Sequence, residues 1–329
     1  MHKKVYWRGA SALTEKKSTM ADPGTTRGKS RGAVVDGADD LVLPFSTDRS
    51  GIRGRIVRLG AVVDMVLTRH DYPDAVSEAL GQALALTAML GQPLKPGGRL
   101  GFQTRTDGPI RFLLADYEAP GRLRGYASFD ASKIEAMGLR PSQGELIGSG
   151  HMAMTLERAG EDDRYQGIVA LDGQSLGAAA LTYFRQSEQL PSYVRLAVAR
   201  QRVQGGDGWH WRAGGLLIQH PTAGIEDDDS PTAPPDQEDW QRARILAATV
   251  EDHELIDPTL SAERLLFRLF NEEDVRVYQG QPLDARCRCS LERVQMFLSR
   301  FTPEDLEGLR EADGRTAVTC EFCNKKYYF

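Results

Sequence analysis

The stretch 286–298, RCRCSLERVQMFL, and the stretch 319–329, TCEFCNKKYYF, contain every cysteine of this 329-residue chain. The thiols form one C-x-C pair and one C-x-x-C pair, at Cys287, Cys289, Cys320 and Cys323. Two close pairs of thiolates separated by a helical insert are what tetrahedral zinc requires, with Zn–S distances of about 2.3 Å. We therefore predict one zinc ion per chain, held by these four cysteines in the reduced protein.

The insert between the two pairs has a helical pattern that can bring them together. One apolar stripe follows helical spacing, at Val294, Phe297, Leu298 and Phe301. Thr302 and Pro303 are typical of the start of a second helix, and Gly314 is typical of its end. The spacing thus predicts a folded insert that returns the chain toward the first pair.

The predicted zinc-binding module at 283–329 is under about 50 residues long, and modules of that size rarely fold by their hydrophobic core alone. Structural zinc contributes roughly 10–16 kcal/mol of apparent binding free energy in comparable peptides. We therefore expect the metal to decide whether the module is folded, and oxidation of either pair to release it. A purely structural zinc ribbon has the same cysteine geometry, so the spacing alone leaves a redox role open.

The bulk composition predicts a soluble globular protein, with 41% hydrophobic and 26% charged residues. No apolar run approaches the roughly 18 residues that a membrane span needs, and the first residues lack the apolar core of a secretion signal. We therefore expect a cytoplasmic protein with no membrane partner. In that reducing compartment, paired cysteines bind metal more often than they form structural disulfides.

Charge is unevenly distributed along the chain, whose net charge is −5. Residues 1–31 carry eight Lys or Arg and two Asp or Glu, whereas the rest of the chain is acidic. We expect residues 1–38 to be a disordered basic extension, with Met20 as an alternative start of the protein. The acidic body argues against nucleic acid as the main partner.

Residues 39–220 are predicted to form one α+β domain with a largely antiparallel sheet packed by helices. Pro73 precedes a long apolar helix that ends near Gly91. Short β-like runs then alternate with glycine turns, which indicates hairpins rather than βαβ units. A further helix is expected at 173–189, and a hairpin follows it around the turn 204–208, QGGDG.

Residues 221–282 are predicted to be a metastable linker in two parts. The first part, 221–239, has four prolines and a cluster of acids but almost nothing apolar. The second part is helical with a β-like end at Val275 and Val277. Its helices carry an apolar stripe at Leu265, Leu266, Leu269 and Phe270. Helices this short do not hold together alone, so they must pack against another part of the protein.

Residues 24–30, GTTRGKS, resemble a phosphate-binding P-loop, but three residues separate their glycines where the motif needs four. No strand precedes the segment, so its backbone could not be aimed at a phosphate. We therefore expect no nucleotide site and no use of ATP.

Residues 173–177, GQSLG, match the G-x-S-x-G nucleophile elbow and follow a predicted strand. A serine esterase would use Ser175 as nucleophile and one histidine as base, from His210, His220 and His253. The preceding strand alternates instead of forming a buried apolar run, and no HGGG-type loop is present. We favour a helix capped by Asp172 and keep the esterase as a less favoured alternative.

Three stretches of the domain and the cysteine pattern together resemble a known family. The stretches are YQGIVALDGQSL at 165–176, YFRQSEQLPS at 183–192 and AGGLLIQ at 213–219. With the linker and the C-terminal CRC…TCEFCNKKYYF, the chain is similar over residues 39–329 to the bacterial heat-shock protein 33 family, the redox-regulated chaperones. The segment before residue 39 has no counterpart in the family pattern.

The resemblance implies a holdase that is switched on by oxidation and binds unfolding client proteins without ATP. In the reduced protein the zinc module would be folded and the linker packed on the main domain, which keeps the chaperone inactive. Oxidants would form disulfides within each pair, Cys287–Cys289 and Cys320–Cys323, and release the zinc. The module and the adjoining linker would then unfold and expose apolar surface. The active form in the family is a homodimer.

A zinc-ribbon nucleic-acid-binding protein is the competing class. Such a protein would present a basic face, yet residues 284–329 carry eight Lys or Arg and eight Asp or Glu. An enzyme would need a convergent acid, base or nucleophile, and the sequence shows no such set. We therefore expect a chaperone that is not an enzyme and does not bind nucleic acid.

Overall fold

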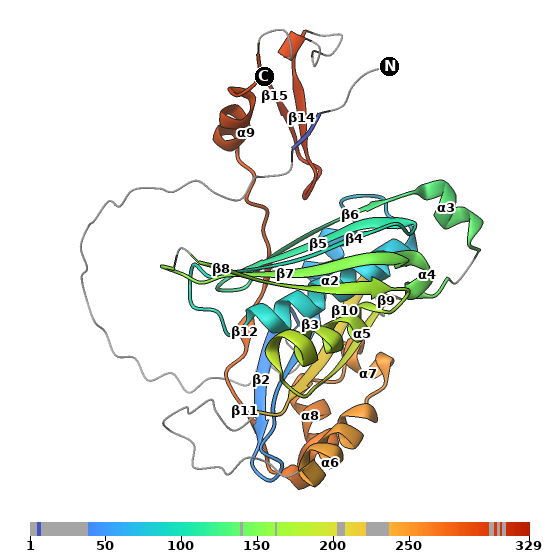
Figure 1. Cartoon of the computed structure of the whole chain (residues 1–329), viewed down its shortest axis with the longest axis vertical. Helices are drawn as coiled ribbons and strands as arrows, with labels where there is room; N and C mark the ends of the chain where they lie inside the picture. The colour runs from blue at the N-terminus through green and yellow to red at the C-terminus, as the bar shows by residue number, and fades with distance from the viewer. Residues whose placement is uncertain are drawn as a thin grey trace. The chain divides into compact units, whose positions relative to one another are not determined.

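The computed structural model (Figure 1) describes residues 5–7, 39–138, 141–161, 163–202, 208–221, 237–302, 306–307, 310 and 314–329. The chain divides into a large unit, Gly37–Cys287, and a small unit made of Met1–Asp36 and Arg288–Phe329. Helices and mainly antiparallel sheets make up the described residues, so the predicted α+β class is confirmed.

The large unit contains two six-stranded sheets where we predicted one. The first, here called the β10 sheet, has the order β11-β2-β3-β10-β9, with β12 beside β2. Its strands are β2 (Leu41–Thr47), β3 (Arg53–Leu59), β9 (Ser192–Arg202), β10 (Trp209–Gln219), β11 (Val275–Val277) and β12 (Gln281–Pro282). β9 and β10 are the predicted hairpin, and each pairs along eleven residues.

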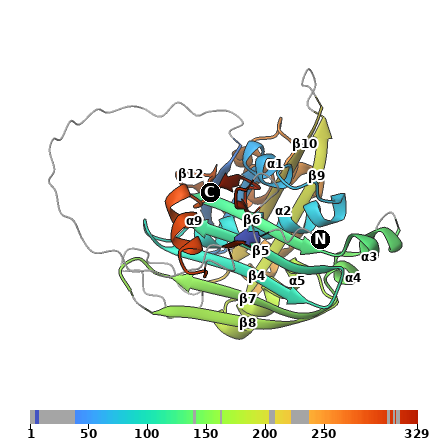
Figure 2. The ribbon, with the colours of Figure 1, turned by 90° about the horizontal axis from the view of Figure 1, so that it is seen from above.

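The second sheet, here called the β5 sheet, has the order β13-β6-β5-β4-β7-β8. Figure 2 shows β6, β5, β4, β7 and β8 side by side in this order. Its strands are β4 (Arg99–Thr106), β5 (Ile110–Glu118), β6 (Arg122–Phe129), β7 (Ser149–Glu157), β8 (Arg164–Asp172) and β13 (Asp284–Ala285). β4, β5 and β6 form two successive hairpins, β7 and β8 form another, and the antiparallel pairing of β4 with β7 joins them; the short strand β13 lies parallel to β6.

Helix α2 (Asp74–Gly91) lies between the two sheets and packs against strands of both (Figure 1). Most of its residues are buried, because it is apolar on all sides, as a helix enclosed by protein must be. The predicted start after Pro73 is confirmed. At Gly91 a Cβ would lie 2.3 Å from the ring of Tyr117, so only glycine permits the helix end to approach β5 this closely.

Four further helices of the large unit surround α2 and the sheet edges: α1 (Ala61–Leu67), α3 (Ala131–Ala136), α4 (Gln143–Ile147) and α5 (Leu176–Tyr183). α5 continues into a π-helical turn, η1 (Phe184–Glu188), which ends at Gln189 with a left-handed backbone. The helix predicted at 173–189 therefore begins three residues later than expected and changes its winding before Pro191.

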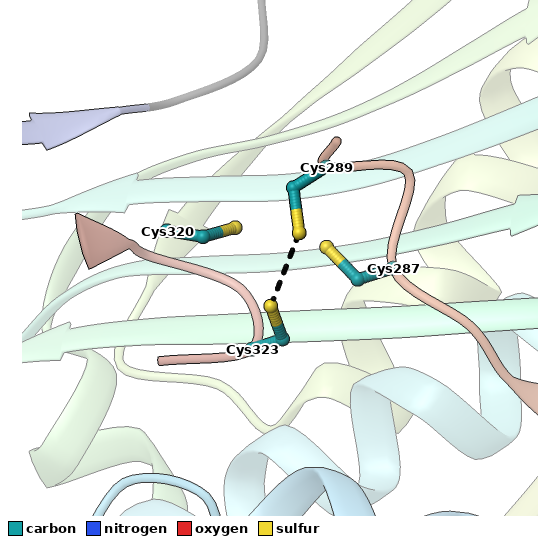
Figure 3. A group of neighbouring side chains, drawn as sticks. All are labelled: Cys287, Cys289, Cys320 and Cys323. Carbon is teal, nitrogen blue, oxygen red and sulfur yellow. Dashed lines mark hydrogen bonds between the residues drawn. The ribbon is translucent and has the colours of Figure 1, made fainter. Parts of the chain in front are cut away.

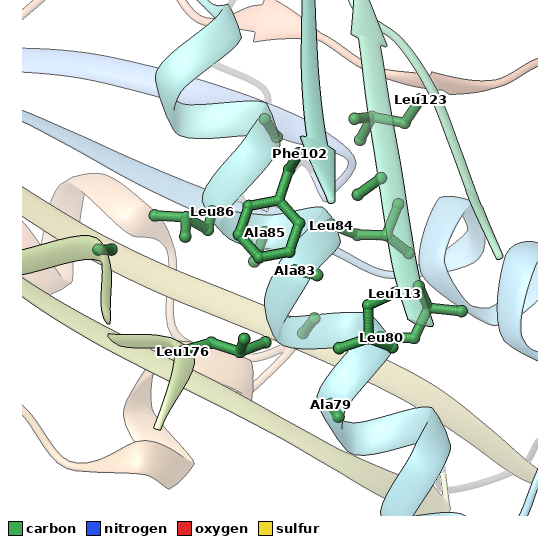
Figure 4. Close-up of a cluster of buried hydrophobic side chains, with 14 of the residues drawn as sticks. Ala79, Leu80, Ala83, Leu84, Ala85, Leu86, Phe102, Leu113, Leu123 and Leu176 are labelled. Atoms are coloured by element: carbon green, nitrogen blue, oxygen red, sulfur yellow. The ribbon is translucent and has the colours of Figure 1, made fainter. Parts of the chain in front are cut away.

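The main hydrophobic core is formed where α2 meets the β5 sheet (Figure 4). Leu80 and Leu84 of α2 lie among side chains of three strands and of α5: Phe102, Leu113, Leu123 and Leu176. These side chains are fully buried. Burying such large apolar side chains contributes roughly 1.5–3 kcal/mol each, so this cluster is the main source of the unit's stability.

A second hydrophobic cluster covers the opposite face of the β10 sheet. In β3, Val57 belongs to the main core whereas its neighbour Ile56 belongs to the second cluster, and Leu217 and Leu216 of β10 divide in the same way. This follows from strand geometry, because successive side chains point to opposite faces. The β10 sheet therefore needs an apolar cover on each face.

The cover of the second face consists of three helices, here called the linker helices: α6 (Gln237–Ala248), α7 (Asp252–Ile256) and α8 (Ala262–Phe270). The predicted apolar stripe of α8 is buried there, at Leu265, Leu266, Leu269 and Phe270. The ring of Phe270 lies 5.5 Å from the ring of Phe45 in β2. The short helices thus pack against the domain, as the pattern requires.

The chain after α8 stays hydrogen-bonded to the large unit. It forms the turn η2 (Asn271–Glu273) and then β11 beside β2, which confirms the β-like end expected at Val275 and Val277. Leu283 donates its backbone N–H to Asp40, and Arg286 donates to Leu123. The linker is therefore fastened to both sheets before the first cysteine is reached.

The small unit contains α9 (Leu291–Leu298) and a sheet of β1 (Val5–Trp7), β14 (Ala317–Cys320) and β15 (Lys326–Tyr328). β14 and β15 are antiparallel, and β1 lies parallel to β14 on its other side. α9 confirms the first helix expected in the insert, whereas the second, from Thr302 to Gly314, falls mostly outside the described residues.

The domain limits at 38, 220 and 282 stay predictions. Of the extension 1–38, predicted to be disordered, the structure describes residues 5–7, which form β1; Met20 and the P-loop-like segment 24–30 lie outside the described residues.

Leu84→Ala is expected to lower the free energy of unfolding of the large unit by about 2–5 kcal/mol, because it leaves a cavity in the main core. Leu84 is 1% exposed. Met65→Ala, in α1 and 47% exposed, is the matched control and should change it by less than about 0.5 kcal/mol. Urea unfolding of both variants measures the difference. Equal losses would show that the α2 contacts do not dominate stability.

Candidate metal centre and docked linker

The four cysteines come from two short segments that lie next to secondary structure. Cys287 and Cys289 precede α9, whose first turn is capped by Ser290 through the backbone N–H of Arg293 at 3.3 Å. Cys320 is the last residue of β14, and Cys323 lies in the turn between β14 and β15. The cap fixes the position at which the chain enters α9 directly after the first pair. The hairpin fixes the position of the second pair.

The turn that holds the second pair is closed by backbone hydrogen bonds. Asn324 donates its N–H to the carbonyl of Cys320 at 2.8 Å, and Cys320 donates to the carbonyl of Lys325 at 2.9 Å. Asn324 has a left-handed backbone (φ 56°), a conformation that asparagine tolerates better than most residues. The C-x-x-C pair is therefore held in a tight, preformed turn.

The side chains of Cys287, Cys289, Cys320 and Cys323 point toward one another (Figure 3), and their sulfurs lie within 4.8 Å of one another. All four are free thiols, and the 3.3 Å between the sulfurs of Cys289 and Cys323 is far from a disulfide bond of about 2.05 Å. Four sulfurs bound tetrahedrally at about 2.3 Å lie about 3.8 Å from one another. The cluster therefore fits a tetrahedral metal ion.

Sequence reasoning missed one polar neighbour of the cluster. The hydroxyl of Tyr327 in β15 donates a hydrogen bond to the sulfur of Cys289 at 3.2 Å. Burial raises the pKa of Tyr327, and the hydrogen bond to Cys289 raises it further. The aromatic residues that follow the C-x-x-C pair could have suggested a returning strand, but which of them faces the sulfurs depends on the register.

Burial in the small unit is concentrated in a small number of side chains. Cys320 is fully buried, as are Val318 in β14 and Val294 in α9. Phe322, inside the C-x-x-C turn, is also buried. Cys287, Cys289 and Cys323 are only half-buried, so Cys320 is the one cysteine of the four that is fully enclosed.

Ser175 occupies a structural position. Its hydroxyl accepts a hydrogen bond from the backbone N–H of Ala178 at 3.2 Å and caps α5. The expectation that Asp172 caps this helix is wrong: Asp172 is the last residue of β8, and the helix starts only at Leu176. The motif GQSLG here joins an antiparallel strand to a capped helix.

The three histidines considered as bases have other neighbours. His210 lies 3.1 Å from the carboxylate of Asp64, and His253 lies 3.2 Å from that of Glu251. The ring of His220 stacks edge-on against Trp240. These contacts assign the histidines to surface and linker packing, which gives no support to an esterase at Ser175.

Two buried arginines hold the loop between α7 and α8. Arg58 of β3 donates to the backbone carbonyls of Asp257 and Leu260, and Arg212 of β10 donates to that of Ile256 at 2.7 Å. Asp39 lies 2.6 Å from Arg212 and 3.5 Å from Arg58, so its carboxylate offsets one of their two positive charges. Burial lowers the pKa of Arg58, and Asp39 opposes that shift. Buried carbonyls without these donors would each be costly.

A third arginine fastens α6 to the chain that follows α8. Arg242 lies 2.6 Å from Glu273 and 2.7 Å from Asp239. Burial raises the pKa of Glu273, but hydrogen bonds from Arg242 and Ser50 outweigh it and hold the pKa below its usual value. The linker helices are thus held by apolar packing and by a small number of directional polar contacts.

No helix among the described residues is long and apolar enough to cross a membrane.

Comparison with known proteins gives one consistent result. The family model described as Hsp33 protein matches residues 40–329. The 33 kDa chaperonin of Caulobacter vibrioides is 44% identical over 292 residues, covering 88% of this chain and 94% of the relative. The 33 kDa chaperonin of Nitrosococcus oceani is 36% identical over 285 residues, covering 87% of this chain and 89% of the relative. The crystal structure of the 33 kDa chaperonin from Thermotoga maritima shares the fold, with a TM-score of 0.68, 22% identity, and coverage of 88% and 94%.

Arg58→Met should loosen the linker helices by about 1–3 kcal/mol in all, because it leaves two part-buried carbonyls, those of Asp257 and Leu260, without these donors. Arg49→Met is the control, because Arg49 forms an exposed ion pair with Asp274, a residue of the chain that follows α8. Hydrogen exchange of α7 and α8 should rise in the first variant and stay unchanged in the second. Unchanged exchange in Arg58→Met would mean that apolar packing alone holds the helices.

Proposed function

The chain belongs to the Hsp33 family, and from this premise we propose that it is a redox-regulated, ATP-independent holdase that binds unfolding proteins under oxidative stress. The observation that carries the proposal is the cluster of four free thiols within 4.8 Å of one another. Such a cluster holds a metal only while all four sulfurs are reduced. It therefore links the redox state of the protein to the folding of its C-terminal module.

In the reduced state, Cys287, Cys289, Cys320 and Cys323 would hold one Zn²⁺. The bound ion would keep the thiolates deprotonated and join the two ends of a module too small to fold by its core. This chain's own residues supply the rest: Ser290 and the turn at Asn324 position the pairs, and Tyr327 contacts Cys289. With two ligands lost to a disulfide, the remaining pair cannot hold the module together.

The disulfides proposed for the active state are Cys287–Cys289 and Cys320–Cys323. Each closes a very small loop, and small or strained disulfides are readily reduced, so cellular thiols could reset the switch. The sulfurs 3.3 Å apart in the reduced structure are those of Cys289 and Cys323, one from each pair. Formation of the proposed bonds would take the sulfurs out of the metal-binding arrangement, which fits a switch that unfolds as it oxidises.

Client binding would use the surface that the linker helices cover. Undocking frees the stripe of α8 and the second face of the β10 sheet, with Leu43, Phe45, Ile56, Leu216 and Ile218. Apolar surface of this kind binds exposed segments of unfolding proteins by the hydrophobic effect, which needs no nucleotide. The proposed active form is a cytoplasmic homodimer with no nucleic-acid partner.

The proposal predicts coupled changes in zinc and chaperone activity. The reduced protein should contain one equivalent of zinc, and peroxide with mild warming should release it and suppress aggregation of a thermally unfolding client. Dithiothreitol plus zinc should reverse both, and ATP should affect neither. Zinc content and light scattering measured on the same sample test this.

Ser175→Ala is the control for this experiment and should leave the switch intact, because the serine only caps α5. Less than half an equivalent of zinc in the reduced protein, or equal protection by the reduced and oxidised forms, would refute the proposed switch. Ester hydrolysis that disappears in Ser175→Ala would instead support the esterase.

Leu269→Asp should give chaperone activity while zinc is still bound. Leu269 is 3% exposed in the second cluster, and a buried carboxylate there opposes docking of α8. Phe267→Asp, in the same helix at 64% exposure, should stay as inactive as the reduced parent. Aggregation assays with parallel zinc analysis compare the two. If both variants remain inactive, docking of α8 does not restrain the chaperone.

A further inference from the structure

We propose that Tyr327 is a positioning residue of the thiol switch: its hydroxyl holds the sulfur of Cys289 in the metal-binding arrangement and lowers its reactivity toward oxidants. The inference rests on the proposed function and adds a residue that the cysteine spacing does not contain.

The contact between Tyr327 and Cys289 has a defined direction. The hydroxyl of Tyr327 lies 3.2 Å from the sulfur of Cys289 and is the donor. A phenol keeps its proton at neutral pH, and a thiolate can only accept. The sulfur accepts this bond, and when the sulfur is a metal-bound thiolate the bond is made to a charged partner and is correspondingly stronger.

The register of the C-terminal hairpin sets which tyrosine faces the cluster. Tyr327 pairs with Val318 across the β14–β15 ladder, and Tyr328 pairs with Ala317. Because neighbouring side chains of a strand point to opposite faces, Tyr327 is buried and Tyr328 is 46% exposed. The ammonium of Lys325 lies 5.0 Å from the centre of the Tyr327 ring and helps to hold it in place.

The hydrogen bond acts on the first chemical step of oxidation. A thiolate attacks one oxygen of hydrogen peroxide, an S–O bond forms, the O–O bond breaks and hydroxide leaves. A second thiolate then attacks that sulfur, an S–S bond forms, the S–O bond breaks and a second hydroxide leaves, so the two electrons pass to the peroxide. A hydrogen-bond donor on the sulfur of Cys289 stabilises the electron pair that attacks the peroxide. The hydrogen bond therefore slows the attack. A group that hydrogen-bonds to a metal ligand also orients that ligand, and removal of the group weakens metal binding.

The test compares Tyr327→Phe with Tyr328→Phe in the full-length protein, since each variant removes one hydroxyl from the same strand. Tyr327→Phe should lower zinc affinity by about tenfold in competition with a chelator. It should also raise the rate at which Cys289 is alkylated, followed by mass spectrometry of its peptide with and without zinc. Tyr328→Phe should match the parent protein in both measurements.

A spectroscopic measurement separates this role from packing. In the cobalt-substituted protein, the thiolate-to-cobalt charge-transfer band should move to lower energy in Tyr327→Phe, because the sulfur electrons lose a hydrogen bond. The thermal midpoint of the reduced protein is recorded in parallel. A lower midpoint with an unchanged band and unchanged Cys289 reactivity would overturn the proposal, as would equal behaviour of the two variants. These readouts do not involve clients, so they stand apart from the test of the chaperone switch.

Discussion

The β10 sheet is apolar on both faces, and the rest of the large unit is arranged to satisfy that constraint. A sheet of this kind is stable only between two layers. Helix α2 supplies one layer with side chains that reach the main core. The linker helices supply the other, with short helices and directional bonds from Arg58 and Arg212. One cover is integral to the fold, whereas the other is a separate segment that can leave without breaking a strand pairing of β3 or β10.

The two parts of the chain depend on different sources of stability. The large unit has an extensive main core to which the linker helices contribute no residue. The small unit has few buried apolar side chains among its described residues, and its sulfurs lie where a metal ion would join them. Strands β11, β12 and β13 connect the linker helices to Cys287 and are very short, with two or three residues each. Short pairings of this kind open at low free-energy cost, which suits a segment proposed to transmit unfolding.

Local patterns predicted much of this structure. The long helix after Pro73, the β9–β10 hairpin, the stripe of α8 and the gathering of the four cysteines followed from periodicity and spacing. The division into two sheets did not, because strand order depends on contacts between distant segments. Arg58, Arg212 and Tyr327 were missed for the same reason: each contacts a partner that lies 38 to 202 residues away in the sequence. The cap of α5 was predicted at Asp172, three residues before the actual cap, Ser175. Both residue types cap helices, so the sequence alone does not distinguish two candidates this close together.

The linker helices remain covalently attached to the sheet that they cover. The segment from β10 to α6 is seventeen residues long, so an undocked α8 would stay within reach of its own site. A tethered ligand of this kind acts at an effective concentration on the order of millimolar. A client bound to the second face of the β10 sheet would therefore compete with the linker helices, which stay tethered to the same molecule. In the proposed switch, reduction of the cysteines and refolding of the module would therefore favour recapture of the site and release of the client, with no energy source beyond the refolding itself.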